Sequence, residues 1–132
     1  RGEVIIENNN FHNLWGPALL IEDDCNFWFE SGYTKEIIFR NNRVSRCENA
    51  CMWEGAPSIR YTPKVMDESS ETPVHGRLVL KDNIFEKPHF AEHLIWLEYV
   101  EEAEISGNSF DAPYRIKTKC VKKVTDSGNT VG

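Results

Sequence analysis

The stretch Val4-Ile5-Ile6-Glu7-Asn8-Asn9-Asn10-Phe11 decides the fold, because its pattern returns along the chain. A short apolar run is followed by polar residues, an Asn, one further residue and an apolar side chain. Later copies of the pattern are Ile37–Val44, Leu78–Phe85, Ala103–Phe110 and, in a shorter form, Ser127–Val131. The asparagines that align between the copies are Asn9, Asn42, Asn83, Asn108 and Asn129, and their separations are irregular.

A constant local pattern at irregular intervals is typical of a right-handed parallel β-helix, in which coils share strands and corners while the loops vary in length. The alternating apolar residues should point into a narrow core, and Ile6, Phe39, Leu80 and Ile105 should face inward. Asn tolerates the left-handed backbone of a sharp corner, and stacked asparagines can bond to their equivalents about 4.8 Å away. The sequence therefore predicts an all-β fold, a right-handed parallel β-helix of about four to five irregular coils.

A second apolar run follows each corner and ends in an acid, at Ala18–Glu22, Ala50–Glu54 and Leu94–Glu98. We expect these runs to be neighbouring strands of one sheet, with Glu22, Glu54 and Glu98 on adjacent rungs. Two segments that break the pattern, at about 24–34 and 56–76, are expected to be long loop insertions. Residues 1–132 should form one β-helix segment. We interpret the chain as a fragment of a longer β-helix, because it opens without Met and almost directly in a strand-like run.

Composition excludes several classes of function. The net charge of −6 and the pI of about 5.2 argue against binding to nucleic-acid phosphates. The longest apolar runs fall far short of the roughly 20 residues that span a bilayer. The four cysteines, Cys25, Cys47, Cys51 and Cys120, form no CxxC pair, and we expect buried small hydrophobes, with a Cys47–Cys51 bridge or metal pair as the alternative. No cofactor is expected, and these patterns leave the oligomeric state open.

The acids Glu22-Asp23-Asp24 are followed by the aromatic-rich stretch Cys25–Glu30. Three consecutive acids are costly to keep charged together unless they are solvated, paired or used in chemistry. Paired carboxylates are the groups that glycoside hydrolysis requires, one to protonate the leaving oxygen and one to activate water or attack. An aromatic such as Trp28 beside them can stack on a sugar ring. The alternative is a solvated turn whose aromatics form a small satellite core.

The stretch His89-Phe90-Ala91-Glu92-His93 matches the inverted zinc motif H-x-x-E-H. On a helix, His89 and His93 would lie on one face and could bind zinc, with Glu92 as the base. However, Leu94–Leu97 falls where the other copies place their second strand. We therefore predict a strand there, and two surface histidines that share no metal.

The stretches Glu7–Phe11, Trp15–Ala18, Ile21–Asp24, Trp28–Glu30 and Arg40–Asn42 together resemble the α-1,3-galactosidases of glycoside hydrolase family 110. The resemblance implies a parallel β-helix, export from a bacterial cell to the periplasm or the exterior, and removal of terminal α-1,3-linked galactose with inversion. The family's adjacent Asp pair maps onto Asp23 and Asp24. A further essential acid of the family lies upstream of the matching part.

The resemblance implies catalytic roles for Asp23 and Asp24, and the position and chemistry of the other candidates suggest theirs. The catalytic candidates are Asp23, Asp24 and Glu54, and the candidates for sugar contact are Glu22, Trp28, Trp53 and Arg60. The expected partner is a carbohydrate with terminal galactose. Two alternatives stay open: a non-catalytic carbohydrate-binding or surface β-helix module, and a zinc hydrolase that uses His89, Glu92 and His93.

Overall fold

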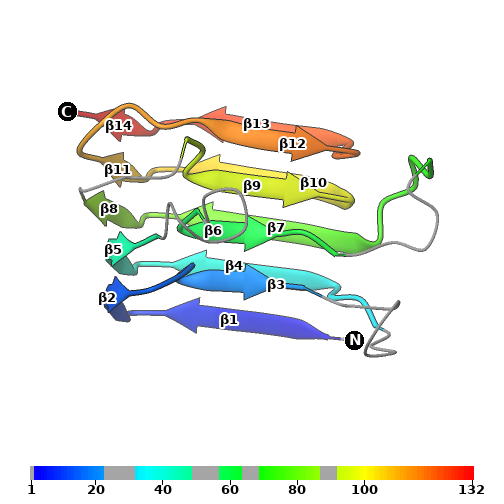
Figure 1. Ribbon diagram of the computed structural model, residues 1–132, viewed down its shortest axis with the longest axis horizontal. Helices are drawn as coiled ribbons and strands as arrows, with labels where there is room; N and C mark the ends of the chain where they lie inside the picture. Colours follow the sequence, from blue (N-terminus) through cyan, green and yellow to red (C-terminus); the bar gives the residue numbers. More distant parts are fainter. Residues whose placement is uncertain (1, 23–31, 49–56, 64–68, 87–91) are drawn as a thin grey trace.

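The computed structural model describes residues 2–22, 32–48, 57–63, 69–86 and 92–132 (Figure 1). These residues form fourteen strands and no helix, so none of the described segments is a helix able to cross a membrane. Sheet A contains β1 (Glu3–Glu7), β4 (Glu36–Arg40), β7 (His75–Lys81), β10 (Val100–Ser106) and β13 (Lys123–Ser127). Sheet B contains β2 (Asn10–Leu14), β5 (Arg43–Cys47), β8 (Ile84–Glu86), β11 (Ser109–Phe110) and β14 (Thr130–Val131). Sheet C contains β3 (Leu19–Ile21), β6 (Ile59–Tyr61), β9 (Ile95–Glu98) and β12 (Ile116–Lys119).

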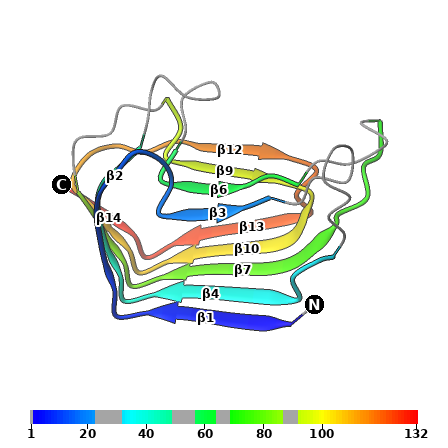
Figure 2. The ribbon, with the colours of Figure 1, turned by 60° about the horizontal axis from the view of Figure 1, so that its bottom comes forward.

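The chain visits the three sheets in the constant order A, B, C, and every strand pair within a sheet is parallel. Each passage through the three sheets is one coil, and the coils stack from β1 at one end to β13 and β14 at the other (Figure 1). Sheets A and C lie face to face, and sheet B closes one side (Figure 2). This arrangement is the all-β parallel β-helix that the repeat predicts.

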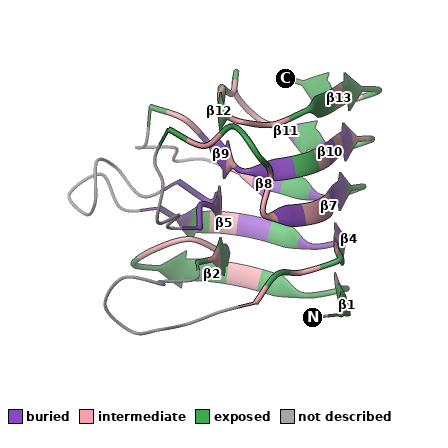
Figure 3. Cartoon of the chain, turned by 90° about the vertical axis from the view of Figure 1, so that its right-hand side faces the viewer, coloured by how far each residue is buried: buried purple, intermediate pink, exposed green. Residues whose placement is uncertain are grey.

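The core lies between the sheets and is deepest in the middle coils (Figure 3). Phe39, Leu80 and Ile105 are each 0% exposed, and the partly buried Ile6 packs against them. Strand alternation produces this core, because every second residue of a sheet A strand points inward. Burying such a side chain stabilises the fold by roughly 1.5–3 kcal/mol. The four inward positions predicted from the repeat are confirmed.

The aligned asparagines form a ladder of hydrogen bonds at the corner between sheets A and B. The Oδ1 atom of Asn42 accepts bonds from the backbone N–H of Asn9 at 2.9 Å and from its Nδ2 at 3.1 Å. The Nδ2 group of Asn42 in turn donates to the carbonyl of Ile6, one coil back, at 2.9 Å. Asn108 and Asn129 repeat the full pattern. At Asn83, Oδ1 accepts the backbone N–H of Asn42 and Nδ2 donates to the carbonyl of Phe39. The predicted stacking is confirmed.

The left-handed backbone of each corner lies one residue earlier than the sequence analysis placed it. At this corner the residues with positive φ are Asn8 (60°), Asn41 (53°), Asp82 (55°), Gly107 (65°) and Gly128 (65°). Each of them directly precedes a ladder asparagine. At the corner the preceding residue turns the chain, so that the ladder asparagine can point its amide inward. Asn83, for example, is 0% exposed.

The middle strand of sheet C differs from the prediction. The rung between β3 and β9 is formed by β6 (Ile59–Tyr61), not by Ala50–Glu54. Ile59 and Tyr61 are both 0% exposed and point inward on either side of Arg60, whose side chain points outward, so this run has the required alternation. The predicted loop 56–76 therefore contains a strand. Residues 49–56 lie outside the described part of the chain.

The described cysteines are free thiols. Cys47 is buried, as predicted, and its thiol donates to the carbonyl of Ser45 at 3.4 Å. Burial raises the pKa of the Cys47 thiol. Cys120 is half-buried, and Cys25 and Cys51 lie outside the described residues.

Candidate functional site

The outer face of sheet C carries a row of side chains in register across its four strands. The row consists of Leu20, Arg60, Trp96 and Lys117. Their neighbours along each strand point into the core, because successive side chains of a strand alternate between the two faces. A second outward row lies two residues further along each strand. It consists of Glu22, Thr62, Glu98 and Lys119, and we call the two rows together the sheet C face.

An indole lies at the centre of the sheet C face. The guanidinium carbon of Arg60 is 4.8 Å from the ring centroid of Trp96, and the Nζ atom of Lys117 is 3.9 Å from it. Both distances are those of cation–π contacts. Trp96 points outward, yet it is only 8% exposed. Its ring is therefore occupied by protein cations and offers no open platform for a sugar.

Two hydrogen bonds orient the polar groups of the same face. The indole Nε1–H of Trp96 donates to Oε1 of Glu98 at 3.1 Å, and Nε–H of Arg60 donates to the Thr62 hydroxyl at 2.9 Å. Each bond joins residues two apart in an extended segment, which alternation places on the same side. The Glu98 carboxylate and the Arg60 guanidinium are thus held in place before any ligand arrives.

Two carboxylates of the sheet C face share one row. Glu22 follows β3 and is exposed, Glu98 ends β9, and Thr62 occupies the rung between them. Adjacent strands are about 4.8 Å apart, so the backbones that carry the two acids are separated by about 9.6 Å. Carboxyl groups roughly 6.5–9.5 Å apart suit an inverting glycosidase, because a water fits between acid and base. Side-chain rotation from these backbone positions covers that range.

A basic residue also lies at the end of this row. Lys119 lies beside Glu98 in register, and the pKa of its ammonium group is raised, chiefly by its interaction with Tyr99. The Nζ atom of Lys119 is 5.5 Å from the Tyr99 ring centroid. The last strand of the sheet therefore presents permanent positive charge next to the Glu98 carboxylate.

The structure places only some of the residues predicted for the site. Glu22 and Arg60 lie on the sheet C face, in the first and second coils. Thr62 occupies the rung on which Glu54 was predicted. The predicted site residues outside the described part of the chain are Asp23, Asp24, Trp28, Trp53 and Glu54. In the sequence, Asp23 and Asp24 follow directly after Glu22.

No role for Trp96, Glu98 or Lys117 was predicted from the sequence. Glu98 was recognised as the acid that ends an apolar run, and this position is the signal that could have included it among the site residues. Trp96 lies within that apolar run, and the sequence did not show that its side chain points outward, because this direction depends on the register of β9 against β6. Lys117 gave no signal at all, since its place depends on the pairing of β12 with β9.

The described part of the H-x-x-E-H motif, on which the zinc alternative depends, contains no helix. Glu92 is non-helical, and residues 95–98 form β9, so the strand predicted there is confirmed. The Glu92 carboxylate lies 3.5 Å from the guanidinium of Arg115. The described residues contain no group of three or more metal-ligating side chains, whereas His89 falls outside the description.

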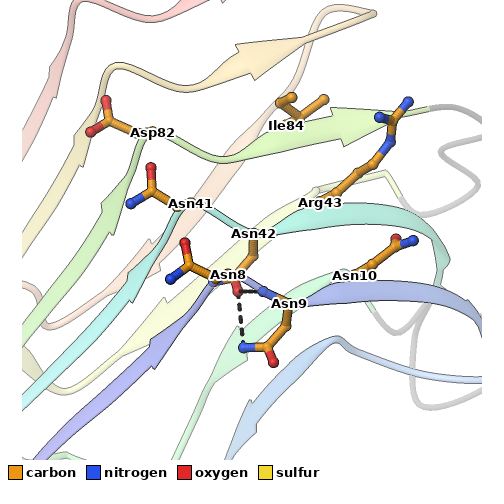
Figure 4. A pocket seen from close by; sticks show the side chains of 8 residues that line it. All are labelled: Asn8, Asn9, Asn10, Asn41, Asn42, Arg43, Asp82 and Ile84. Carbon is orange, nitrogen blue, oxygen red and sulfur yellow. Dashed lines mark hydrogen bonds between the residues drawn. The ribbon is translucent and has the colours of Figure 1, made fainter.

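A hollow lies at the asparagine corner. It is an open hollow of about 470 Å³ (Figure 4). Its lining residues are Asn8, Asn9, Asn10, Asn41, Asn42, Arg43, Asp82 and Ile84. Asp82 is the single carboxylate among them, and hydrolysis of a glycosidic bond normally uses two. The sheet C face is therefore the better candidate for catalysis.

Known proteins that are similar in sequence to part of this chain are named α-1,3-galactosidases. The α-1,3-galactosidase B of Bacteroides thetaiotaomicron is 35% identical over 85 residues, which are 64% of this chain and 14% of that enzyme. The α-1,3-galactosidase A of Bacteroides fragilis is 33% identical over 88 residues, and the α-1,3-galactosidase B of Phocaeicola vulgatus is 34% identical over 90.

The matching part covers 14% of the B. fragilis enzyme and 15% of the P. vulgatus enzyme, so it is a small part of each relative. No family model matches the chain, and no solved structure gives a significant match. The chain is similar in sequence to a segment of the α-1,3-galactosidases, and the resemblance predicted from its motifs is confirmed.

Proposed function

We propose that this chain forms part of an exo-glycosidase that hydrolyses terminal α-1,3-linked galactose with inversion. Three relatives named α-1,3-galactosidase support the substrate class. The observation that carries the proposal is that Glu98 shares an outward row, with a single rung between, with Glu22, the residue that directly precedes Asp23 and Asp24 in the sequence. A catalytic acid next to Glu22 in the sequence would be separated from Glu98 by a distance that suits an inverting reaction better than a retaining one, whose carboxyl groups are about 5 Å apart.

In the proposed reaction one carboxylic acid protonates the glycosidic oxygen while a carboxylate on the opposite side deprotonates the attacking water. Asp23 and Asp24 are the proposed catalytic acids that the resemblance implies. Successive residues of an extended chain point to opposite faces, so one of the two should act with a carboxylate from another coil. Glu98 is a proposed partner, because the Trp96 N–H already fixes its position. Glu54 stays a second candidate for this partner.

The remaining predicted residues would hold the sugar. The Arg60 guanidinium, oriented by Thr62, can donate to galactose hydroxyls. Trp28 and Trp53 are proposed as stacking platforms, a role that the enclosed ring of Trp96 does not fill. Hydrolysis by two carboxylates requires no cofactor. We also propose that the protein acts in the periplasm or outside the cell, which rests on the family resemblance alone.

The test measures hydrolysis of an α-1,3-linked galactobiose by the polypeptide that the complete natural reading frame encodes. Proton NMR during the first turnovers identifies the anomer that is released. We expect β-galactose first, and a loss of rate of about 10²-fold or more in Asp23→Asn or Asp24→Asn. Asp82→Asn is the matched control, because Asn8 and Asn41 already occupy the equivalent corner position and the φ of Asp82 suits Asn.

Three outcomes would contradict parts of this proposal. Initial release of α-galactose would exclude inversion. Full activity in both Asp variants would exclude their catalytic role. Galactoside binding without any hydrolysis would favour the non-catalytic carbohydrate-binding module instead.

A further inference from the structure

Two rows of outward side chains flank the asparagine ladder at the corner between sheets A and B. The first row is Asn8, Asn41 and Asp82, and the second row is Asn10, Arg43 and Ile84. The ladder asparagine of each coil lies between the two rows and points inward, because successive side chains of an extended chain alternate. Figure 4 shows the rows on the two sides of Asn9 and Asn42. The open hollow of about 470 Å³ lies between these rows, and we call it the corner hollow.

The corner hollow follows the axis of the stack. Neighbouring residues of each row belong to successive coils, so they are about 4.8 Å apart. Both rows point away from the axis, and a further coil on either side would extend the hollow and would not fill it. Its volume of about 470 Å³ is that of a small-molecule site. The shape therefore suits a linear ligand that lies parallel to the axis.

The amides along the corner hollow are available to a ligand. Asn8, Asn10 and Asn41 are exposed, and their side chains form no hydrogen bond with the part of the chain that the structure describes. Each amide offers one carbonyl acceptor and two N–H donors. The inward amide of Asn42, in contrast, is already bonded to the neighbouring coils. The hollow thus presents three unused amides that can both donate and accept.

The charged groups at the corner hollow are engaged or turned aside. The Arg43 guanidinium donates to the carboxylate of Glu86 on the next coil. One oxygen of Asp82 lies where the Cβ atom of a larger residue at position 107 would be, so this carboxylate is directed along the stack over Gly107. Asp82 therefore closes one end of the hollow and contributes none of the contacts that follow. The remaining lining residues are uncharged.

This chemistry selects a neutral sugar chain over an ion. An anion requires a cation that is not already paired, and Arg43 is paired with Glu86. A hard cation such as Ca²⁺ requires six or more oxygen ligands, usually with several carboxylates among them. Sugar hydroxyls both donate and accept, as amides do. Ile84, which is 43% exposed, adds an apolar surface for the C–H face of a sugar ring.

We propose that the corner hollow is a non-catalytic binding site for a neutral oligosaccharide that lies along the axis of the stack. The amides of Asn8, Asn10 and Asn41 bind its hydroxyls, and Ile84 packs against a ring. The site is on the corner of sheets A and B, whereas the candidate catalytic residues Arg60 and Glu98 are on sheet C. It goes beyond the proposed hydrolysis and does not depend on it.

The test measures binding of β-1,4-linked galactotetraose to the complete natural polypeptide by ligand-observed NMR titration. This probe carries no α-linkage, so binding is read separately from the proposed hydrolysis. We expect saturable binding with a dissociation constant of about 1 mM or tighter.

Two substitutions locate the bound sugar. Asn41→Gly should weaken binding about 3- to 10-fold, the effect of losing one or two neutral hydrogen bonds, and Gly107 and Gly128 already occupy the equivalent corner position. Asn10→Ala, in the facing row, should weaken binding to a similar extent. Asn13→Gly is the matched control, because Asn13 is also exposed, has a φ of 57° and does not line the hollow. Circular dichroism confirms that each variant is folded.

Several results would overturn the proposal. They are an absence of saturable binding, binding that both Asn41→Gly and Asn10→Ala leave unchanged, and an equal loss of binding in Asn13→Gly. Competition by inorganic sulfate at matched ionic strength would identify an anion site instead. Binding that requires added Ca²⁺ would identify a metal site.

Discussion

The side-chain oxygen of Asn83 accepts the backbone N–H of Asn42 at 2.9 Å, and both residues are buried. The amide of Asn83 also donates to the carbonyl of Phe39, so one side chain satisfies two backbone groups of the preceding coil. Buried backbone groups without a partner cost roughly 1–3 kcal/mol each. The ladder is therefore a row of buried hydrogen bonds inside an otherwise apolar stack of coils.

Asn83→Ala should lower the free energy of unfolding by about 3 kcal/mol, because it leaves a buried N–H and a buried carbonyl without partners. Urea denaturation followed by circular dichroism measures the change. Asn10→Ala is the matched control: Asn10 is exposed, and its loss should alter stability by less than about 0.5 kcal/mol. Equal effects of the two substitutions would show that the ladder does not stabilise the fold.

Gly76→Ala should destabilise the protein through backbone crowding. A Cβ atom at Gly76 would lie 2.2 Å from the carbonyl oxygen of Lys35, a contact that requires the backbone of one coil to shift. We expect a loss of about 1–3 kcal/mol in the free energy of unfolding, again by urea denaturation. Gly16→Ala is the control, because nothing lies within 4 Å of its added Cβ. A stable Gly76→Ala protein would mean that sheet A tolerates a wider spacing there.

Tyr114 should make stability depend on alkaline pH. Burial, followed by the hydrogen bond that its hydroxyl donates to Asp126 at 2.7 Å, raises the pKa of Tyr114 to about 12. The unfolded chain loses this proton near pH 10, so the contribution of Tyr114 is complete below pH 10 and is lost as pH rises toward 12. Urea denaturation between these values should show falling stability. In Tyr114→Phe this part of the fall should be absent, and an unchanged profile would contradict the assignment.

Glu98→Gln should lower the turnover of an α-1,3-galactoside if Glu98 is the partner of the Asp pair. Gln keeps an acceptor for the Trp96 N–H but cannot transfer a proton, so kcat should fall by about 10²-fold or more with little change in KM. Glu101→Gln, on an exposed residue that pairs with Lys122, is the control. Wild-type kcat in Glu98→Gln would return the partner role to Glu54 or to an acid outside the described residues.

Zinc should not copurify with the protein in stoichiometric amount. His89 and His93 are predicted to share no metal, because the chain is already in an extended strand at residue 95. Metal analysis by mass spectrometry after dialysis measures the content. Zinc that persists through dialysis and disappears in His93→Ala would revive the zinc hydrolase alternative.

The sequence alone was enough to predict sheet A, sheet B and the corner between them. The alternation of Val4–Ile6 and its copies specifies which side chains enter the core, and each ladder asparagine marks its own corner. Such signals are local: they depend on neighbours within about eight residues, so irregular spacing between coils does not obscure them. One feature of the corner differed from the prediction: the left-handed residue lies one position before the ladder asparagine. The reason is that each ladder amide must reach buried hydrogen-bond partners in the adjoining coil.

The second strand of sheet C was decided only by tertiary structure. Ala50–Glu54 is the more apolar run, yet Ile59–Tyr61 forms the rung, because pairing with β3 and β9 requires inward side chains on both sides of an outward Arg60. The same pairing places Arg60 and Lys117 on the two sides of Trp96. Residues that are distant in sequence meet there through strand register and loop length, and neither leaves a periodic trace in the amino-acid order.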